Sequence, residues 1–278
     1  MQTVMAPSRV DLERIRPVIA HPRSGAPLVW GKDHSVAAEE FRLLARRLHR
    51  YRVEKPIQSV LITSALPAEG KSTVALNLAA TLERQGGRTV LIDTNLRGAE
   101  IHDILGLDAV PGLSEVLSGH IALDRALRRV DPLGLYFLAS GDAVGNPVSL
   151  FETPEFPNLL KQVRQAFEWV ILDSPPLNRL ADSQCIAAAC DATLLVVRWG
   201  FTPRTELEHV IALLDGYPVL GMVINTFYDP LDSYYDSHYE NRKSLLAMAS
   251  GPASMDPGEP ATEGHFQDPS DHRKPKRG

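Results

Sequence analysis

The stretch ITSALPAEGKST, residues 62–73, ends an apolar run and closes on Gly-Lys-Ser-Thr. Such an ending is typical of a phosphate-binding loop, in which backbone N–H groups surround phosphate oxygens, the lysine contacts the terminal phosphates and the hydroxyl binds Mg²⁺. The first half of this loop is irregular, because Ala65 stands where the motif has its first glycine, and Pro67 and Glu69 stiffen and charge the turn. The elements on either side of the loop therefore decide whether it binds phosphate.

Six short runs of apolar residues, rich in β-branched side chains, recur along the chain. They occupy residues 57–64, 88–93, 135–140, 169–173, 192–199 and 219–225. Continuous runs of this kind are typical of parallel strands that are buried on both faces of a sheet. We therefore predict an α/β fold with a doubly wound, mostly parallel sheet of the P-loop class.

Helical patterns alternate with these runs. They lie at 35–51, between Lys71 and Gly86, at 158–167 and at 203–214. Ser35 is the predicted N-cap of the first helix. The last helix is predicted to have Thr202 as its N-cap and Pro203 at its first helical position.

The loop at 62–73 thus lies between a predicted strand and a predicted helix, which is the context expected of a phosphate-binding loop. In the alternative interpretation, Gly70 merely starts a helix and Lys71 is a solvated charge. We favour the first interpretation and expect these residues to bind a nucleotide: Pro67, Ala68, Glu69, Gly70, Lys71, Ser72 and Thr73.

Length and composition restrict the class of protein. The 278 residues are 44% apolar, enough for one α/β domain with flexible ends. A net charge of −5 argues against a partner nucleic acid. Cys185 and Cys190 fit neither a zinc site nor a redox pair, so we expect ordinary buried thiols of a cytosolic protein. We also expect a soluble, cytoplasmic chain, because no run approaches the ~20 apolar residues of a membrane span and no secretory leader is apparent.

Proline and polar residues suggest the boundaries of the domain. Residues 1–35 contain four prolines and no sustained period, and are predicted to form a flexible N-terminal arm. The α/β domain is predicted at 36–228, followed by a tyrosine-rich segment at 229–240. Residues 241–278 are polar and proline-rich, and we predict that they form a disordered tail.

Two carboxylates follow predicted strands directly. Asp173 ends the run WVILD, and Asp93 ends the run RTVLID, with Asn95 and Arg97 just beyond it. Open α/β sheets bind ligands at the carboxyl ends of their strands, which favours a metal-binding role for both aspartates. In the alternative, each one only caps or forms the turn that follows its strand.

Four of the seven tyrosines of the chain lie within twelve residues, namely Tyr228, Tyr234, Tyr235 and Tyr239. They could pack as core aromatics. The acidic residues and serines between them instead favour an exposed segment, because such a stretch cannot bury itself.

The run VLIDTNLR at 90–97 resembles the Walker A′ motif of bacterial tyrosine autokinases, the BY-kinases of capsule and exopolysaccharide loci, in which a strand precedes Asp-x-Asp-x-Arg. The loop resembles their proline-containing Walker A motif, which usually has glycine where this chain has Ala68. The related partition and septum-positioning ATPases carry a signature lysine at the position of Leu66. Other similar stretches follow in the family's order, at 112–119, 146–151, 173–183 and 219–225, so that the resemblance runs from about Glu39 to Glu240.

The resemblance implies a role for each residue that matches the motifs. Lys71 stabilises the transferring phosphoryl group of ATP, and Asp93 positions or deprotonates the incoming tyrosine. Asn225 contacts adenine, and the four clustered tyrosines accept phosphate. The implied Mg²⁺ shell consists of Ser72, Asp93, Asn95 and Asp173.

Two positions depart from the family's pattern. Asn95 replaces the second aspartate of Walker A′, so it keeps an oxygen for a metal-bound water but lacks the charge. If Asn95 lies in the metal shell, Asn95→Asp should raise the rate of autophosphorylation. In the family's oligomerisation motif Glu-x-x-Arg-x-x-Arg, Glu39 and Arg42 match, whereas Ala45 stands at the last position.

The resemblance also implies partners. They are a membrane polysaccharide co-polymerase whose cytoplasmic tail activates the chain and recruits it to the inner face of the membrane, further copies bound through the helix at 36–50, and a phosphotyrosine phosphatase. Asn95 leaves open a nucleotide-gated scaffold that transfers little phosphate, and a partition-like ATPase switch is a third interpretation.

Overall fold

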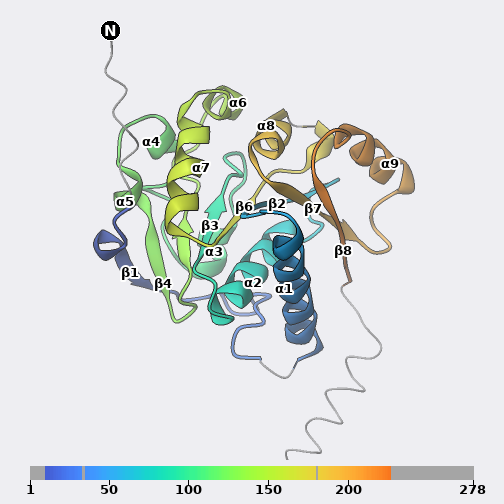
Figure 1. Cartoon of the computed structure of the whole chain (residues 1–278), viewed down its shortest axis with the longest axis horizontal. Helices are drawn as coiled ribbons and strands as arrows, with labels where there is room; N and C mark the ends of the chain where they lie inside the picture. The colour runs from blue at the N-terminus through green and yellow to red at the C-terminus, as the bar shows by residue number, and fades with distance from the viewer. Residues whose placement is uncertain (1–9, 33–34, 180, 227–278) are drawn as a thin grey trace, which may run out of the picture. The chain divides into compact units, whose positions relative to one another are not determined.

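A single sheet of eight strands organises the residues that the computed structural model describes, which are 10–32, 35–179 and 181–226 (Figure 1). The strands are β1 Arg16–Ile19, β2 Ser59–Ser64, β3 Thr89–Asp93, β4 Arg128–Asp131, β5 Tyr136–Leu138, β6 Trp169–Asp173, β7 Ala192–Arg198 and β8 Val219–Asn225. Their order is β1-β4-β5-β3-β6-β2-β7-β8, and neighbours run parallel except for β4 and β5. The predicted doubly wound, mostly parallel sheet is confirmed.

Helices connect the strands. They are α1 Val36–Glu54, α2 Lys71–Arg84, α3 Ile101–Leu105, α4 Leu113–Leu117, α5 Leu123–Ala126, α6 Pro147–Phe151, α7 Glu155–Ala166, α8 Ala181–Ala189 and α9 Arg204–Leu213, with short 3-10 helices η1 Leu12–Arg14 and η2 Leu177–Arg179. The predicted Ser35 cap is confirmed, because its hydroxyl accepts a hydrogen bond from the N–H of Ala38.

The three central strands are buried along their whole length, as their continuous apolar runs predicted. Their side chains alternate between two cores. Val60 and Ile62 of β2 pack with α1 and α2, whereas Leu61 packs with α7 and α8 on the opposite face. Figure 1 shows these pairs of helices on the two sides of the central strands. The carboxyl ends of β2, β3 and β6 therefore meet at one edge between the two helical layers.

Helix α9 begins one residue later than the sequence predicted. Pro203 is its N-cap, and the predicted cap, Thr202, makes no capping hydrogen bond. The Thr202 hydroxyl instead accepts a hydrogen bond from the N–H of Arg198 and donates one to Glu69. A cap prediction considers only backbone groups that are near in the sequence. Here the Thr202 hydroxyl donates its hydrogen bond to the carboxylate of Glu69, which is distant in the sequence.

Part of the predicted flexible arm is instead a strand. Residues Arg16–Ile19 form β1, which pairs with β4 at the edge of the sheet. Pro17 has no N–H to donate, and an edge strand tolerates this because only one side of it is paired. Four residues are too few to produce a periodic pattern, which is why the sequence did not reveal this strand.

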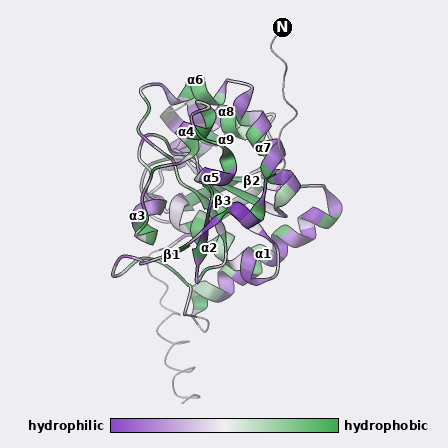
Figure 2. Ribbon diagram, turned by 90° about the vertical axis from the view of Figure 1, so that its left-hand side faces the viewer, coloured by the Kyte–Doolittle hydropathy of each residue, from purple (hydrophilic) through white to green (hydrophobic). Residues whose placement is uncertain are grey.

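Helix α1 is largely hydrophilic on its outer side (Figure 2). Glu39 and Arg42 form an ion pair of 2.8 Å on that exposed side. Ala45, which replaces the last arginine of the oligomerisation motif, is fully buried in the core beneath α1. Assembly through this helix remains a prediction. Among the described helices, none is long and apolar enough to span a bilayer.

Candidate functional site

The phosphate loop lies at the end of β2, and its backbone bends sharply before α2 begins at Lys71. Ala68 and Gly70 both have left-handed backbone angles, with φ of 61° and 89°. A Cβ atom at Gly70 would lie 2.1 Å from Nδ2 of Asn225, so only glycine fits there. The first N–H groups of this fourteen-residue helix provide a binding site for anions.

Lys71 and Ser72 stand at the first turn of α2 and are both nearly buried. Burial of the ammonium group keeps water from screening its charge, so that a phosphate in the loop would be attracted strongly. The structure thus places Lys71 and Ser72 where the motif predicted them.

Side chains at the ends of β7 and β8 form hydrogen bonds with the backbone of the phosphate loop. The Asn225 side chain donates a hydrogen bond of 2.9 Å to the carbonyl of Glu69, and the Arg198 guanidinium donates one of 3.2 Å to the carbonyl of Ala68. The carboxylate of Glu69 is fully buried and accepts from the N–H of Leu66 and from the hydroxyl of Thr202. The sequence had not suggested that Arg198 or Thr202 contacts this loop, and Thr202 was predicted only as a helix cap.

Asp93 and Asp173 lie side by side at the carboxyl ends of β3 and β6, where they are register partners. Both are fully buried. Three of their four carboxylate oxygens, Oδ2 of Asp93 and both oxygens of Asp173, have no hydrogen-bond partner among the described residues. Buried carboxylates without partners are costly, and they mark a place where a ligand supplies the missing interactions.

Burial also changes the protonation of this pair. It raises the pKa of Asp93 well above its usual range, and the neighbouring charge of Asp173 raises it further. Burial raises the pKa of Asp173 to about 6, although Lys71 opposes the rise. The protein supplies too little positive charge to keep both carboxylates ionised, so a bound cation would fit here.

The chemistry of these donors suits Mg²⁺. This ion prefers hard oxygen ligands and completes its six positions with water and substrate phosphates. Asp93, Asp173 and the Ser72 hydroxyl are such ligands. Among the described residues, no group of three or more His, Cys, Asp or Glu side chains is placed to hold a metal, so phosphate and water oxygens would have to supply the remaining positions.

The loop after β3 is fixed by two further side chains. The N–H of Asn95 donates to Oδ1 of Asp93 at 3.1 Å, and its side-chain Nδ2 donates to the carbonyl of Gly98 at 2.6 Å. Arg97 holds buried Asp182 with two hydrogen bonds, of 2.7 and 3.2 Å. Asn95 therefore orients Asp93 through its backbone and closes the loop through its side chain.

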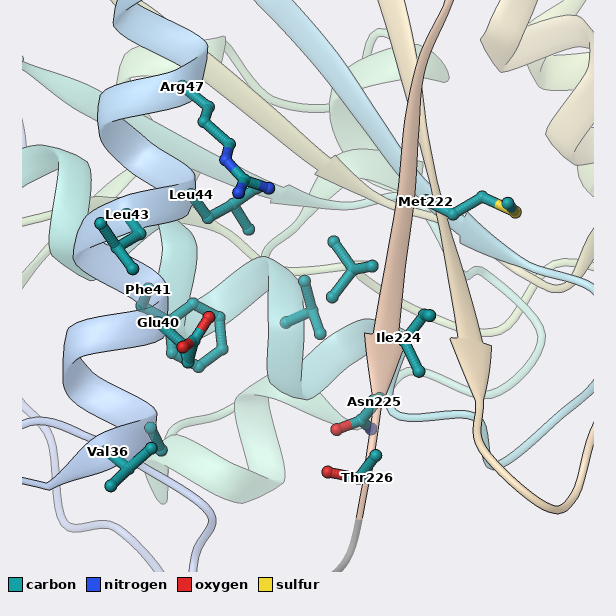
Figure 3. A pocket seen from close by; sticks show the side chains of 13 residues that line it. Val36, Glu40, Phe41, Leu43, Leu44, Arg47, Met222, Ile224, Asn225 and Thr226 are labelled. Atoms are coloured by element: carbon teal, nitrogen blue, oxygen red, sulfur yellow. The ribbon is translucent and has the colours of Figure 1, made fainter. Parts of the chain in front are cut away.

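A cavity of about 370 Å³ lies between α1 and β8 (Figure 3). Phe41, Leu44 and Val74 line it together with Asn225. In Figure 3, Met222 and Ile224 lie on β8 with side chains directed away from α1. The predicted phosphate and metal residues do not line this cavity, so it is distinct from the phosphate site, although Asn225 contacts both.

The structure thus brings together the predicted site residues of the loop and of the strand ends. Asn225 touches the loop itself, and its predicted contact with adenine is not tested. The predicted phosphate acceptors Tyr228, Tyr234, Tyr235 and Tyr239 lie outside the described residues.

Comparison with known proteins places the chain among kinases, although no protein-family model matches it. It is 33% identical over 172 residues to the tyrosine-protein kinase YwqD of Bacillus subtilis (strain 168), and the match covers 62% of this chain and 73% of YwqD. The chain belongs to the bacterial tyrosine-kinase family. The tyrosine-protein kinase CpsD of Streptococcus pneumoniae serotype 4 is 30% identical over 172 residues, which are 61% of this chain and 76% of CpsD.

Solved structures with a similar fold agree. The crystal structure of the chimerical protein CapA2B2 matches with a TM-score of 0.69 and 28% identity, covering 77% of this chain and 95% of that chain. Some curated kinases of the family are much longer. The chain spans only 30% of the length of the tyrosine-protein kinase ptk of Acinetobacter johnsonii, to which it is 29% identical over 220 residues.

Proposed function

We propose that the chain is an ATP-dependent protein-tyrosine kinase that phosphorylates its own tyrosines. One observation carries this proposal: Lys71 and Ser72 begin the helix after the phosphate loop, while Asp93 and Asp173 end adjacent strands with unpartnered carboxylate oxygens. An anion site beside an uncompensated pair of carboxylates suits a nucleotide that carries a divalent cation.

Each residue has a distinct task in the proposed transfer. The ammonium of Lys71 stabilises the negative charge that develops on the transferring phosphoryl group. Ser72 and Asp173 would hold Mg²⁺, with Asp93 beside them. When bound, Mg²⁺ neutralises charge on the phosphates and orients them.

Asp93 is the proposed base. A tyrosine hydroxyl attacks the terminal phosphorus of ATP, its proton passes to Oδ2 of Asp93, and ADP leaves. A tyrosine with a pKa of about 10 benefits from such help. The raised pKa of the buried Asp93 carboxyl makes its ionised form a stronger base than that of an exposed aspartate.

We further propose that the acceptors are the clustered Tyr228, Tyr234, Tyr235 and Tyr239, and that phosphorylation regulates the polymerisation and export of a capsule or exopolysaccharide. A membrane polysaccharide co-polymerase would activate the chain through its cytoplasmic tail and recruit it to the cytoplasmic membrane. Further copies of the chain would bind through the helix at 36–50. A phosphotyrosine phosphatase would reverse the reaction. The similarity to YwqD and CpsD and the density of tyrosines support this proposal.

A second candidate is a nucleotide-gated scaffold with weak or no phosphate transfer. Asn95 favours it, because the loop after β3 has a neutral side chain where the family's motif has a carboxylate. Such a protein would bind Mg-ATP with the same residues but would not label its tyrosines.

The test is incubation of the full chain with Mg-ATP, with and without the activating tail of its partner, followed by detection of phosphotyrosine. Lys71→Met should lower labelling by about 100-fold or more, since it removes the charge that the transferring group needs. Lys161→Met is the matched control, because Lys161 is exposed on α7, and it should label like the wild type.

The proposed acceptors are tested in a variant in which Tyr228, Tyr234, Tyr235 and Tyr239 are all changed to phenylalanine. Tyr51→Phe is the control, because the Tyr51 side chain on α1 is exposed. Labelling should fall to near background while nucleotide affinity is kept. A wild-type protein that binds Mg-ATP tightly yet never labels, even with its activator, would support the scaffold instead.

A further inference from the structure

Glu69 differs from the other charged residues around the phosphate loop. Its carboxylate is fully buried within the loop that is to bind an anion. A negative charge there repels phosphates, so it is costly for binding unless it serves another purpose.

Both oxygens of this carboxylate have donors. Oε2 accepts a 2.7 Å hydrogen bond from the N–H of Leu66, so the side chain bridges the first half of its own loop. Oε1 accepts from the hydroxyl of Thr202, which lies beyond the end of β7. Glu69 therefore ties the loop to a neighbouring strand and keeps its curvature.

Hydrogen bonds also hold the segment between β7 and α9, which contains Thr202. The Thr202 hydroxyl accepts a 3.2 Å hydrogen bond from the N–H of Arg198, and the N–H of Trp199 donates to the carbonyl of Asn225 at 3.0 Å. Arg198 in turn reaches the carbonyl of Ala68. The end of β7 thus meets the phosphate loop at two successive residues.

We propose that Glu69 is a positioning residue, and that its bond to Thr202 braces the phosphate loop in the shape that binds nucleotide. The left-handed angle of Ala68 makes such a brace useful, because an alanine does not hold that angle by itself. This inference rests on the proposed nucleotide site but not on phosphate transfer.

Four variants of the full chain separate bracing from charge. Glu69→Ala removes both acceptors. Glu69→Gln removes the charge but can still accept from Leu66 and donate to the Thr202 hydroxyl, whose proton then turns to the carbonyl of Arg198. Thr202→Val removes the hydroxyl at nearly equal volume, and Thr202→Ser restores it.

The measurements are the dissociation constants of Mg-ADP and of a non-hydrolysable Mg-ATP analogue, the KM and kcat of autophosphorylation, and the melting temperature. Trp199 is 72% exposed beside the brace and offers a fluorescence signal for binding. We expect Thr202→Val and Glu69→Ala to weaken binding and raise KM by about tenfold, the loss typical of a hydrogen bond to a charged group. Thr202→Ser and Glu69→Gln should stay within about threefold of the wild type, and kcat should change less than KM.

The outcomes are distinguishable. If the wild type binds neither nucleotide, the proposed function fails. If the wild type binds and Thr202→Val binds equally well, the brace is refuted. It is also refuted if Glu69→Gln is as weak as Glu69→Ala while Thr202→Val is normal, because the charge rather than the bond would then matter. Weak binding by Thr202→Val that Thr202→Ser restores, at an unchanged melting temperature, supports the brace.

Discussion

Buried carboxylates on the two sides of the phosphate loop differ in their hydrogen bonding. On the side of β3 and β6, Asp93 and Asp173 keep three carboxylate oxygens without a partner among the described residues. On the side of β7 and β8, Glu69 has a donor for each oxygen. All three carboxylates are fully buried.

This difference distinguishes carboxylates that could bind a ligand from one that stabilises the loop. A carboxylate whose hydrogen bonds are complete stabilises the fold as it stands, whereas one with orphaned oxygens lowers stability until a ligand arrives. In the proposed function, Asp173 would therefore hold the cation with Asp93 beside it as the base, and Glu69 would shape the loop. Three variants, Asp173→Asn, Asn95→Asp and Ala68→Gly, test that contrast, beginning with the largest effect.

Asp173→Asn should raise the Mg²⁺ concentration needed for half-maximal activity and lower autophosphorylation by about 100-fold, since a neutral amide neither attracts the cation strongly nor balances the charge of Lys71. A titration of activity and nucleotide affinity with Mg²⁺ measures both effects. Identical Mg²⁺ curves for the variant and the wild type would refute the cation site.

The same variant should change how stability depends on pH. Burial raises the pKa of the Asp173 carboxyl to about 6, from an ordinary value of 3.8. Between these values the folded protein holds a proton that the unfolded chain has lost, so the free energy of unfolding falls as pH rises. Without metal or nucleotide, Asp173→Asn should be more stable than the wild type at pH 7 by roughly 1–3 kcal/mol and about equal near pH 4.

Urea unfolding with a chelator, at several pH values, measures this difference. Asp182→Asn is the control, because Asp182 is equally buried but has Arg97 as its partner. It should destabilise the protein at pH 7. Parallel pH profiles for wild type and Asp173→Asn would contradict the assignment of an uncompensated carboxylate.

Asn95→Asp tests whether Asn95, at the edge of the cation site, binds the metal or closes the loop. The sequence predicted a gain in rate from the added charge if Asn95 lies in the metal shell. The structure gives a reason for the opposite, because Nδ2 of Asn95 donates to the Gly98 carbonyl and a carboxylate there would face that oxygen without a proton. We expect a loss of about 1 kcal/mol in stability and no rise in rate. A faster enzyme with tighter Mg²⁺ use would return Asn95 to the metal shell.

Ala68→Gly concerns the braced side and has the smallest expected effect. Ala68 has a φ of 61°, a left-handed angle that costs an L-residue about 1–2 kcal/mol and costs glycine little. The variant should therefore gain about 1 kcal/mol in stability by thermal unfolding. Ala65→Gly is the control, because Ala65 is fully buried without a positive φ, and it should lose stability. Equal losses for both variants would show that Ala68 is not strained.

The sequence alone determined the central sheet and the place of the site. Strands β2, β3 and β6 are continuous apolar runs; β2 leads into the predicted phosphate loop, and β3 and β6 end on the proposed metal ligands Asp93 and Asp173. These features are local, since a run of strand-forming residues followed by glycine or aspartate lies within one window of the chain. Most of the elements it missed, such as β1, β4 and α3 to α6, have five residues or fewer, which is too short for a period to appear. Helix α8, with nine residues, was missed as well, because its run of small apolar residues gives no clear helical pattern.

Only the tertiary structure decided which groups complete the site. Thr202 reaches Glu69 across 133 residues, and Asn225 reaches it across 156. The sequence suggested a helix cap for the first and a contact with adenine for the second. No local pattern encodes such bonds, because they depend on the order β2-β7-β8 in the sheet. The same holds for the unpartnered oxygens of Asp93 and Asp173, since a carboxylate lacks partners only in relation to everything that is packed around it.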